Sequence, residues 1–146
     1  MRARAVALLA VRPHSRFELG RKLRRFLTDG EATDQIDALL DEFERVGWVS
    51  DQQFAANWVE HRASRYGRQR LRAELALRGI DAQAAQAHLD TLTDSEYPRA
   101  LSLWQRRFGG EVCTGQAERA KQARFLIQRG FSTEIAARIV SGRTPR

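Results

Sequence analysis

Apolar residues recur every three or four positions along almost the whole chain. Phe54 and Trp58 are four residues apart, and so are Leu71 and Leu75. This interval places side chains on one face of an α-helix, which turns once in 3.6 residues. Three prolines interrupt the 146-residue pattern, and no run of alternating β-branched residues indicates a strand. The sequence therefore predicts an all-α fold.

A basic helical segment that ends in glycine occurs three times. The segments are RKLRRFLTDG, RLRAELALRG and KQARFLIQRG, which end at Gly30, Gly79 and Gly130. Each follows a helix with an apolar stripe and precedes another helix after a short polar link. The pattern predicts three tandem three-helix repeats, covering residues 1–48, 49–93 and 94–146. Such units bury their apolar faces by stacking, so we expect an elongated, curved array.

Polar residues mark the helix ends. Glycine adopts the left-handed conformation at a helix C-terminus without steric cost. We expect Thr33, Asp81 and Ser132 to cap the helices that follow the three glycines. Ser50 with Gln53, and Thr93 with Glu96, also have the spacing of a capping box. Residues 94–101 and the pair Gly109–Gly110 are candidate flexible joints.

The segment RPHSRFELGRKL contains a histidine, a serine and a glutamate within five residues, and hydrolases use these residue types. Ser15 lies three residues before Glu18, however, which is the spacing of a capping box. A hydroxyl engaged in such a cap is not available as a nucleophile. We therefore interpret His14, Ser15 and Glu18 as the start of a helix.

The acidic stretch from Asp29 to Glu44 is the other candidate for chemistry. Asp37, Asp41 and Glu44 share one helix face, so a two-metal nuclease site is conceivable there. A solvated acidic face is the favoured interpretation because the sequence indicates no further ligands. Cys113 is the single cysteine, and the histidines and the cysteine lack metal-ligand spacing. We expect no catalytic residue, no metal and no cofactor.

The charge of the chain is strongly positive. Lysines and arginines number 25 against 18 aspartates and glutamates, a formal net charge of +7, and only Lys22 and Lys121 are lysines. A basic chain is attracted to polyanions, although a genome rich in arginine codons would also explain the excess of arginine over lysine. The early apolar run from Ala5 to Val11 is too short to span a bilayer. We expect a cytoplasmic protein.

Basic residues interleaved with aromatic ones recur at corresponding places in the three repeats. We predict that they form one basic stripe that binds a partner or DNA. The alternative is a solvated helix surface with local pairs such as Arg70–Glu74 and Glu74–Arg78. Arg129 continues the pattern in the third repeat, with Arg106 and Arg107 nearby, whereas Phe54, Trp58 and Trp104 fit a core better. The candidate binding residues are Lys22, Arg25, Arg62, Arg65, Arg68, Arg70, Arg72, Lys121 and Arg124.

Three segments together resemble the RecX family of recombination regulators. They are RPHSRFELGRKL, VGWVSDQQFAANWVEHRASRYGRQRLRAELALRGI and KQARFLIQRGFSTEIAARIV, in the family's order. The resemblance implies tandem three-helix repeats in a curved array that binds RecA filaments on DNA. It implies inhibition of RecA ATPase, filament growth and strand exchange, a role in DNA repair and the SOS response, and no catalysis. We expect a monomer. The rival hypothesis is a general DNA-binding helical-repeat protein without recombinase specificity.

Overall fold

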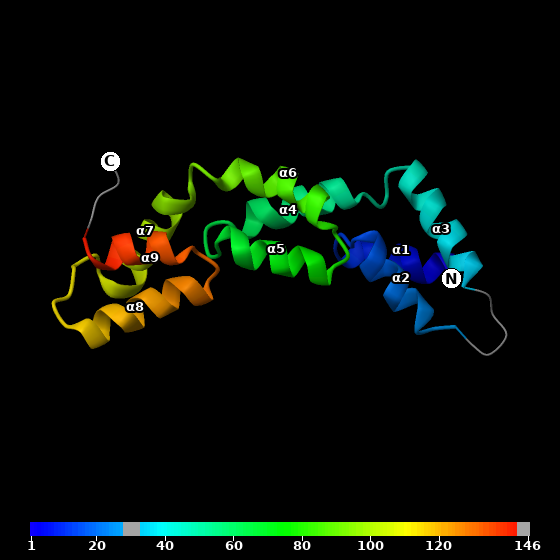
Figure 1. Ribbon diagram of the computed structural model, residues 1–146. Coiled ribbons are helices and arrows are strands. Elements are labelled where there is room, and N and C mark those ends of the chain that lie inside the picture. The colour runs from blue at the N-terminus through cyan, green and yellow to red at the C-terminus, as the bar shows by residue number, and fades with distance from the viewer. Residues whose placement is uncertain (28–32, 143–146) are drawn as a thin grey trace.

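The computed structural model describes residues 1–27 and 33–142, and all regular structure in these ranges is helical. The helices form an elongated array of three groups placed one after another (Figure 1). This arrangement confirms the prediction of an all-α helical array. The helices are α1 (Arg2–Val11), α2 (Arg16–Arg24), α3 (Asp34–Arg45), α4 (Asp51–Arg62), α5 (Arg68–Leu77), α6 (Ala82–Leu89), the short 3₁₀ helix η1 (Asp90–Leu92), α7 (Glu96–Phe108), α8 (Gln116–Gln128) and α9 (Thr133–Val140).

Each group of three helices has its own hydrophobic core, and we call the groups units 1, 2 and 3. Leu19, Ile36 and Phe43 are fully buried in unit 1 (α1–α3), as are Leu71 and Leu75 in unit 2 (α4–α6). A third cluster, which includes Trp104, Leu126 and Phe131, lies within unit 3 (α7–α9). The most extensive helix packing also lies within units. The unit boundaries at residues 48/49 and 93/94 stay predictions.

Serine and aspartate side chains cap four of the helices in the described ranges, α2, α4, α6 and α9. Ser15 and Glu18 form the predicted capping box, in which the Glu18 amide donates to Ser15 Oγ at 3.1 Å and the Ser15 amide donates to the Glu18 carboxylate at 3.3 Å. The side chains of Ser50, Asp81 and Ser132 each accept a hydrogen bond from the amide three residues later. These caps are local in sequence, which explains why the pattern predicted them.

Two capping predictions were wrong. Thr33 precedes α3, but its side chain makes no capping hydrogen bond. Thr93 does not cap α7, because that helix begins after Ser95 and Thr93 Oγ1 accepts from Arg68 Nη1 at 2.9 Å instead. Most of the expected joint at residues 94–101 forms the first turns of α7, where Glu96 is buried. Gly30, predicted to end α2, lies outside the described residues.

The middle helices α2, α5 and α8 follow one another along one edge of the array (Figure 1). At each junction, the start of one middle helix meets the glycine that ends the next. Ser15 Oγ donates to the Arg78 carbonyl at 2.6 Å, and the Gly67 amide donates to the Arg129 carbonyl at 2.8 Å. The two junctions therefore repeat the same arrangement.

The repeated glycine has two roles at these junctions. Gly79 and Gly130 have φ angles of 77° and 94°, so both adopt the left-handed conformation predicted for a helix end. A Cβ on Gly79 would lie 2.2 Å from Phe17 Cβ, and one on Gly130 would lie 2.4 Å from Arg70 Cβ. Glycine is thus required both to end the helix and to let the neighbouring unit approach.

Candidate polyanion-binding surface

Glu74 on α5 gathers three donors from two helices of unit 2. Its carboxylate accepts from Trp58 Nε1 at 2.8 Å, from Arg62 Nε at 2.7 Å and from Arg70 Nε at 3.1 Å. Burial disfavours the charged form of this side chain, but the hydrogen bonds from Arg62, Arg70 and Trp58 outweigh it and lower the pKa of Glu74. The carboxylate therefore stays ionised and holds both guanidinium groups in fixed positions.

Three guanidinium groups surround the ring of Tyr66. The Cζ atoms of Arg70, Arg62 and Arg129 lie 4.1, 4.6 and 5.4 Å from the ring centroid. Arg129 belongs to unit 3, whereas the other residues belong to unit 2. Such contacts attract the cation to the negative face of the ring. They therefore tie units 2 and 3 together with positively charged groups.

The same kind of contact continues on both sides of Tyr66. Arg78 lies over Trp58 with its Cζ 3.9 Å from the ring centroid. In unit 3, Arg129 and Arg107 approach the ring of Phe125 at 5.1 and 5.8 Å. We call the whole set the arginine–aromatic row. It consists of Arg78, Trp58, Arg62, Tyr66, Arg70, Arg129, Phe125 and Arg107, with Glu74 as its acidic centre.

The row carries five arginine charges against the single carboxylate of Glu74. Guanidinium groups bind phosphate and carboxylate through two parallel hydrogen bonds, and their planes stack on flat groups. Because the hydrogen bonds and rings fix their directions, these arginines lose less side-chain entropy on binding than free ones. The row is therefore the candidate surface for a polyanion.

The structure divides the arginines predicted on α5 between two faces. Arg70 joins Arg62 in the row. Arg68 lies on another face of α5, where its Nε is 3.2 Å from Glu96 Oε2, and Arg72 Nη2 donates to Gln86 Oε1 at 2.9 Å. The structure thus does not bring all the predicted residues of unit 2 to one place.

The remaining candidate residues take no part in the contacts that define the row. Lys22 Nζ is 2.8 Å from His14 Nε2 and is half-buried. Arg25, Arg65, Lys121 and Arg124 are exposed, and none has a side-chain ion pair with another residue in the described ranges. That these residues bind a partner stays a prediction.

Comparison with known proteins gives the family. Two family models match the chain. The model of the RecX second three-helix domain matches residues 50–89, and the model of the RecX third three-helix domain matches residues 94–140. The chain is 43% identical to regulatory protein RecX of Ralstonia nicotianae, over 97% of this chain and 87% of that protein. This protein belongs to the RecX family. The resemblance predicted from the three sequence segments is confirmed.

Other RecX proteins agree with this assignment. The identity to regulatory protein RecX of Leptothrix cholodnii is 39%, over 96% of this chain and 87% of that protein. The crystal structure of RecX from Lactobacillus salivarius matches with a TM-score of 0.78 and 22% identity, over 97% of this chain and 93% of that chain. At 22% identity, this structural match shows only that the chain has the RecX fold.

Sequence reasoning missed part of the surface of this RecX chain. Trp58 was predicted to be core, and it does pack against the core of unit 2, but it also lies half-exposed under Arg78. The Arg70–Glu74 pair is confirmed, whereas Arg78 Nη1 donates to the Glu74 carbonyl rather than to its carboxylate. The sequence did contain a signal for this part of the surface, the repeated Arg-Gly dipeptide. Arg78 and Arg129 each immediately precede the glycine that ends a middle helix.

His14, Ser15 and Glu18 of the first repeat have structural roles in the RecX fold. His14 is 3% exposed, and its Nδ1 lies 2.9 Å from the Arg12 carbonyl. Because the Lys22 ammonium can only donate, His14 Nε2 accepts and Nδ1 carries the proton. Ser15 Oγ is engaged with the Arg78 carbonyl, and Glu18 pairs with Arg12 at 3.0 Å. This arrangement confirms the helix-start interpretation.

The acidic helix face of unit 1 is occupied by arginines. Asp37 pairs with Arg24 at 3.1 Å, and Asp41 and Glu44 both pair with Arg16, at 2.7 and 3.0 Å. Across residues 1–27 and 33–142, no group of three or more histidines, cysteines or acids could hold a metal ion. Asp29, the first acid of the stretch, lies outside the described residues. Within the same ranges, no helix has the length and apolarity needed to cross a membrane.

Proposed function

We propose that this protein binds RecA filaments on DNA and inhibits RecA ATPase, filament growth and strand exchange. Membership in a family of regulatory proteins supports a regulatory role. The observation that carries the proposal is the arginine–aromatic row, which crosses the junction between units 2 and 3. A polyanion held on the row is therefore held by two units of an elongated body at once.

The proposed mechanism is mechanical. An elongated basic body lies along the filament and bridges neighbouring subunits, so it resists the motions that accompany ATP turnover. Lys22, Arg25, Arg65, Lys121 and Arg124 extend the contact, as the sequence predicted. In this proposal the protein is a cytoplasmic monomer without catalysis or cofactor, and it regulates homologous recombination in DNA repair and the SOS response.

A RecA ATPase assay tests the proposal. Wild-type protein at a stoichiometric concentration should suppress the DNA-stimulated ATPase, and the Arg70→Glu, Arg129→Glu variant should suppress it at least tenfold less effectively. The Arg45→Glu, Arg138→Glu variant has the same net charge but changes arginines outside the row, so it should inhibit like wild type. An unchanged ATPase in the presence of wild-type protein would refute the proposed function.

A general DNA-binding protein is the second candidate, because the guanidinium groups of the row suit the phosphates of DNA. Binding to DNA alone should then weaken by about 0.9 log units per log unit of salt for each phosphate contacted. If the affinity for naked DNA equals that for RecA filaments at every salt concentration, this second candidate is favoured.

A further inference from the structure

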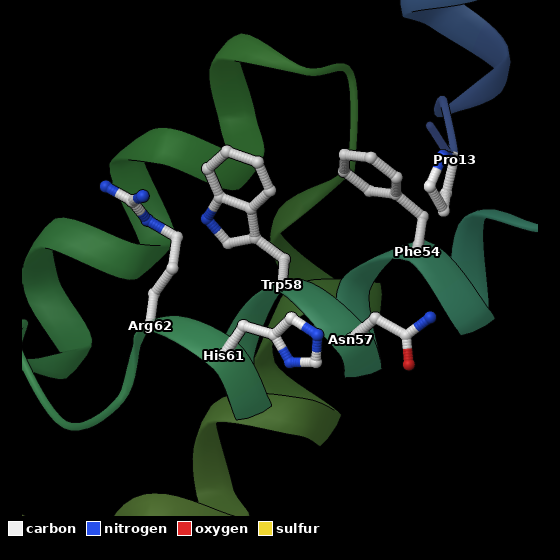
Figure 2. Close-up of a pocket in the computed structure, with 6 residues that line it drawn as sticks. All are labelled: Pro13, Phe54, Asn57, Trp58, His61 and Arg62. Carbon is white, nitrogen blue, oxygen red and sulfur yellow. The ribbon is translucent and has the colours of Figure 1, made fainter. Parts of the chain in front are cut away.

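A groove lies on α4 where units 1 and 2 meet. Its volume is about 290 Å³, near the lower limit for ligand pockets and suited to a single large side chain. Figure 2 shows that its lining residues come from α4 and from the segment between α1 and α2. The lining residues are Pro13, Phe54, Asn57, Trp58, His61 and Arg62.

The interior of the groove is apolar. Phe54 and Trp58 stack with their ring centroids 5.7 Å apart and their planes inclined by 24°. Because Trp58 Nε1 already donates to Glu74, the indole offers its apolar surface to the groove. An aliphatic or aromatic side chain would bury itself here, whereas a phosphate would lose water without gaining a partner from the rings.

The rim of the groove is positively charged. Arg62 lines it directly, Arg78 lies over Trp58, and Arg12 Nη1 donates to the Pro13 carbonyl at 2.8 Å. No carboxylate lines the groove, and the acids that neutralise part of this charge, Glu18 and Glu74, lie outside it. The chemistry that complements this rim is a carboxylate next to the apolar side chain.

Resting on the proposed function, we propose that the groove receives an apolar side chain flanked by carboxylates from a protein subunit of the filament. The groove adjoins the arginine–aromatic row, because Trp58 and Arg62 belong to both. A filament presents protein next to nucleic-acid phosphate, so the two surfaces contact it together. Since Pro13 comes from unit 1, the occupant also bridges units 1 and 2.

Filling the groove tests this assignment without removing a residue of the row. Asn57→Trp places a large ring in the groove, and Gln83→Trp adds the same ring at an exposed position of α6. The probes are RecA filaments on oligo-dT with a non-hydrolysable ATP analogue, and oligo-dT alone. Asn57→Trp should weaken binding to filaments at least tenfold and change binding to oligo-dT less than twofold, while Gln83→Trp changes neither.

The acidic character of the occupant has its own test. His61→Glu should weaken filament binding severalfold, and His61→Gln should leave it unchanged, because only the first variant repels a carboxylate. His61 is exposed, so both variants should fold even if Asn57→Trp does not. Wild-type affinity of the folded Asn57→Trp variant for filaments, equal losses for filaments and oligo-dT, or tighter filament binding by His61→Glu would each overturn the inference. Failure of wild type to bind filaments at all would instead overturn the proposed function, and this inference with it.

Discussion

Replacing Gly130 by alanine should destabilise the protein more than replacing Gly109, although both glycines have left-handed backbones. Their φ angles are 94° and 85°. A Cβ at Gly130 would lie 2.4 Å from Arg70 Cβ and 2.6 Å from the Arg70 backbone nitrogen, whereas a Cβ at Gly109 meets nothing within 4 Å. The pair of variants therefore separates the strain of the conformation from the loss of the junction.

The magnitudes follow from these contacts. A residue with a Cβ loses about 1–2 kcal/mol in the left-handed conformation, and this is the whole cost expected for Gly109→Ala. At Gly130 the clash is with backbone, so the junction must open and its two hydrogen bonds are lost. These join the Gly67 amide to the Arg129 carbonyl and the Gln69 amide to the Gly130 carbonyl. At about 1 kcal/mol for each bond, Gly130→Ala should cost about 3–4 kcal/mol.

Equilibrium urea unfolding measures the difference between the two variants. With a slope of about 2 kcal/mol per molar urea, the unfolding midpoint of Gly130→Ala should lie about 1 M below that of Gly109→Ala. Hydrogen exchange of the Gly67 amide gives a second measurement, because an open junction should accelerate it in Gly130→Ala only. Equal midpoints and equal exchange rates would show that the junction contributes nothing to stability, and would refute this reasoning.

Three further results are expected. Glu74→Gln should lower the free energy of unfolding by about 1–3 kcal/mol, because it weakens the charged hydrogen bonds from Arg62 and Arg70. The control variant Glu60→Gln, on the exposed face of α4, should change this free energy little. Equal urea midpoints of the two variants would contradict this expectation. Burial and the positive charges of Arg12 and Lys22 lower the pKa of His14, so the unfolded chain binds the proton more readily and stability should fall as the pH falls through about 6.5. Urea midpoints at pH 7.5 and 5.5 should show this loss, and a loss of the same size in His14→Gln would assign it to another group. Arg70→Glu should reduce inhibition of RecA ATPase more than Arg72→Glu, because only Arg70 belongs to the row. The two variants have the same net charge. A larger loss of inhibition in Arg72→Glu would place the contact on the other face of α5.

Local patterns predicted the helices, the three units and most of their caps. A capping box, a glycine after a helix and an apolar stripe each depend on residues within about one or two turns, as at Ser15 and Glu18. The capping error at Thr93 has a different origin. Thr93 and Glu96 have the right spacing, but both side chains turn to Arg68, which lies 25 and 28 residues earlier. Spacing alone cannot show which of two possible partners a polar side chain takes.

The arrangement around Glu74 could be predicted only in part, because its donors come from two helices. Arg70 is four residues from Glu74 on the same helix, and that pair followed from helical spacing. Trp58 and Arg62 lie 16 and 12 residues from Glu74, and only the packing of α4 on α5 brings them together. The junction glycines show the same limit. Their sequence positions predicted helix ends, but the approach of Phe17 and Arg70 requires the stacked units.

Helix geometry explains why one basic stripe became two faces. Residues two apart on a helix are rotated by about 200°, so Arg70 must point away from Arg68 and Arg72, which are four apart and share a face. The face of Arg70 continues through Glu74 to Arg78, and it meets Arg129 because Gly130 allows α8 to touch α5. Gly79 and Gly130 thus also bring the arginine before each of them against the preceding unit. The surface proposed to hold the filament is therefore a consequence of how the units join, which is why opening the junction at Gly130 should weaken inhibition as well as stability.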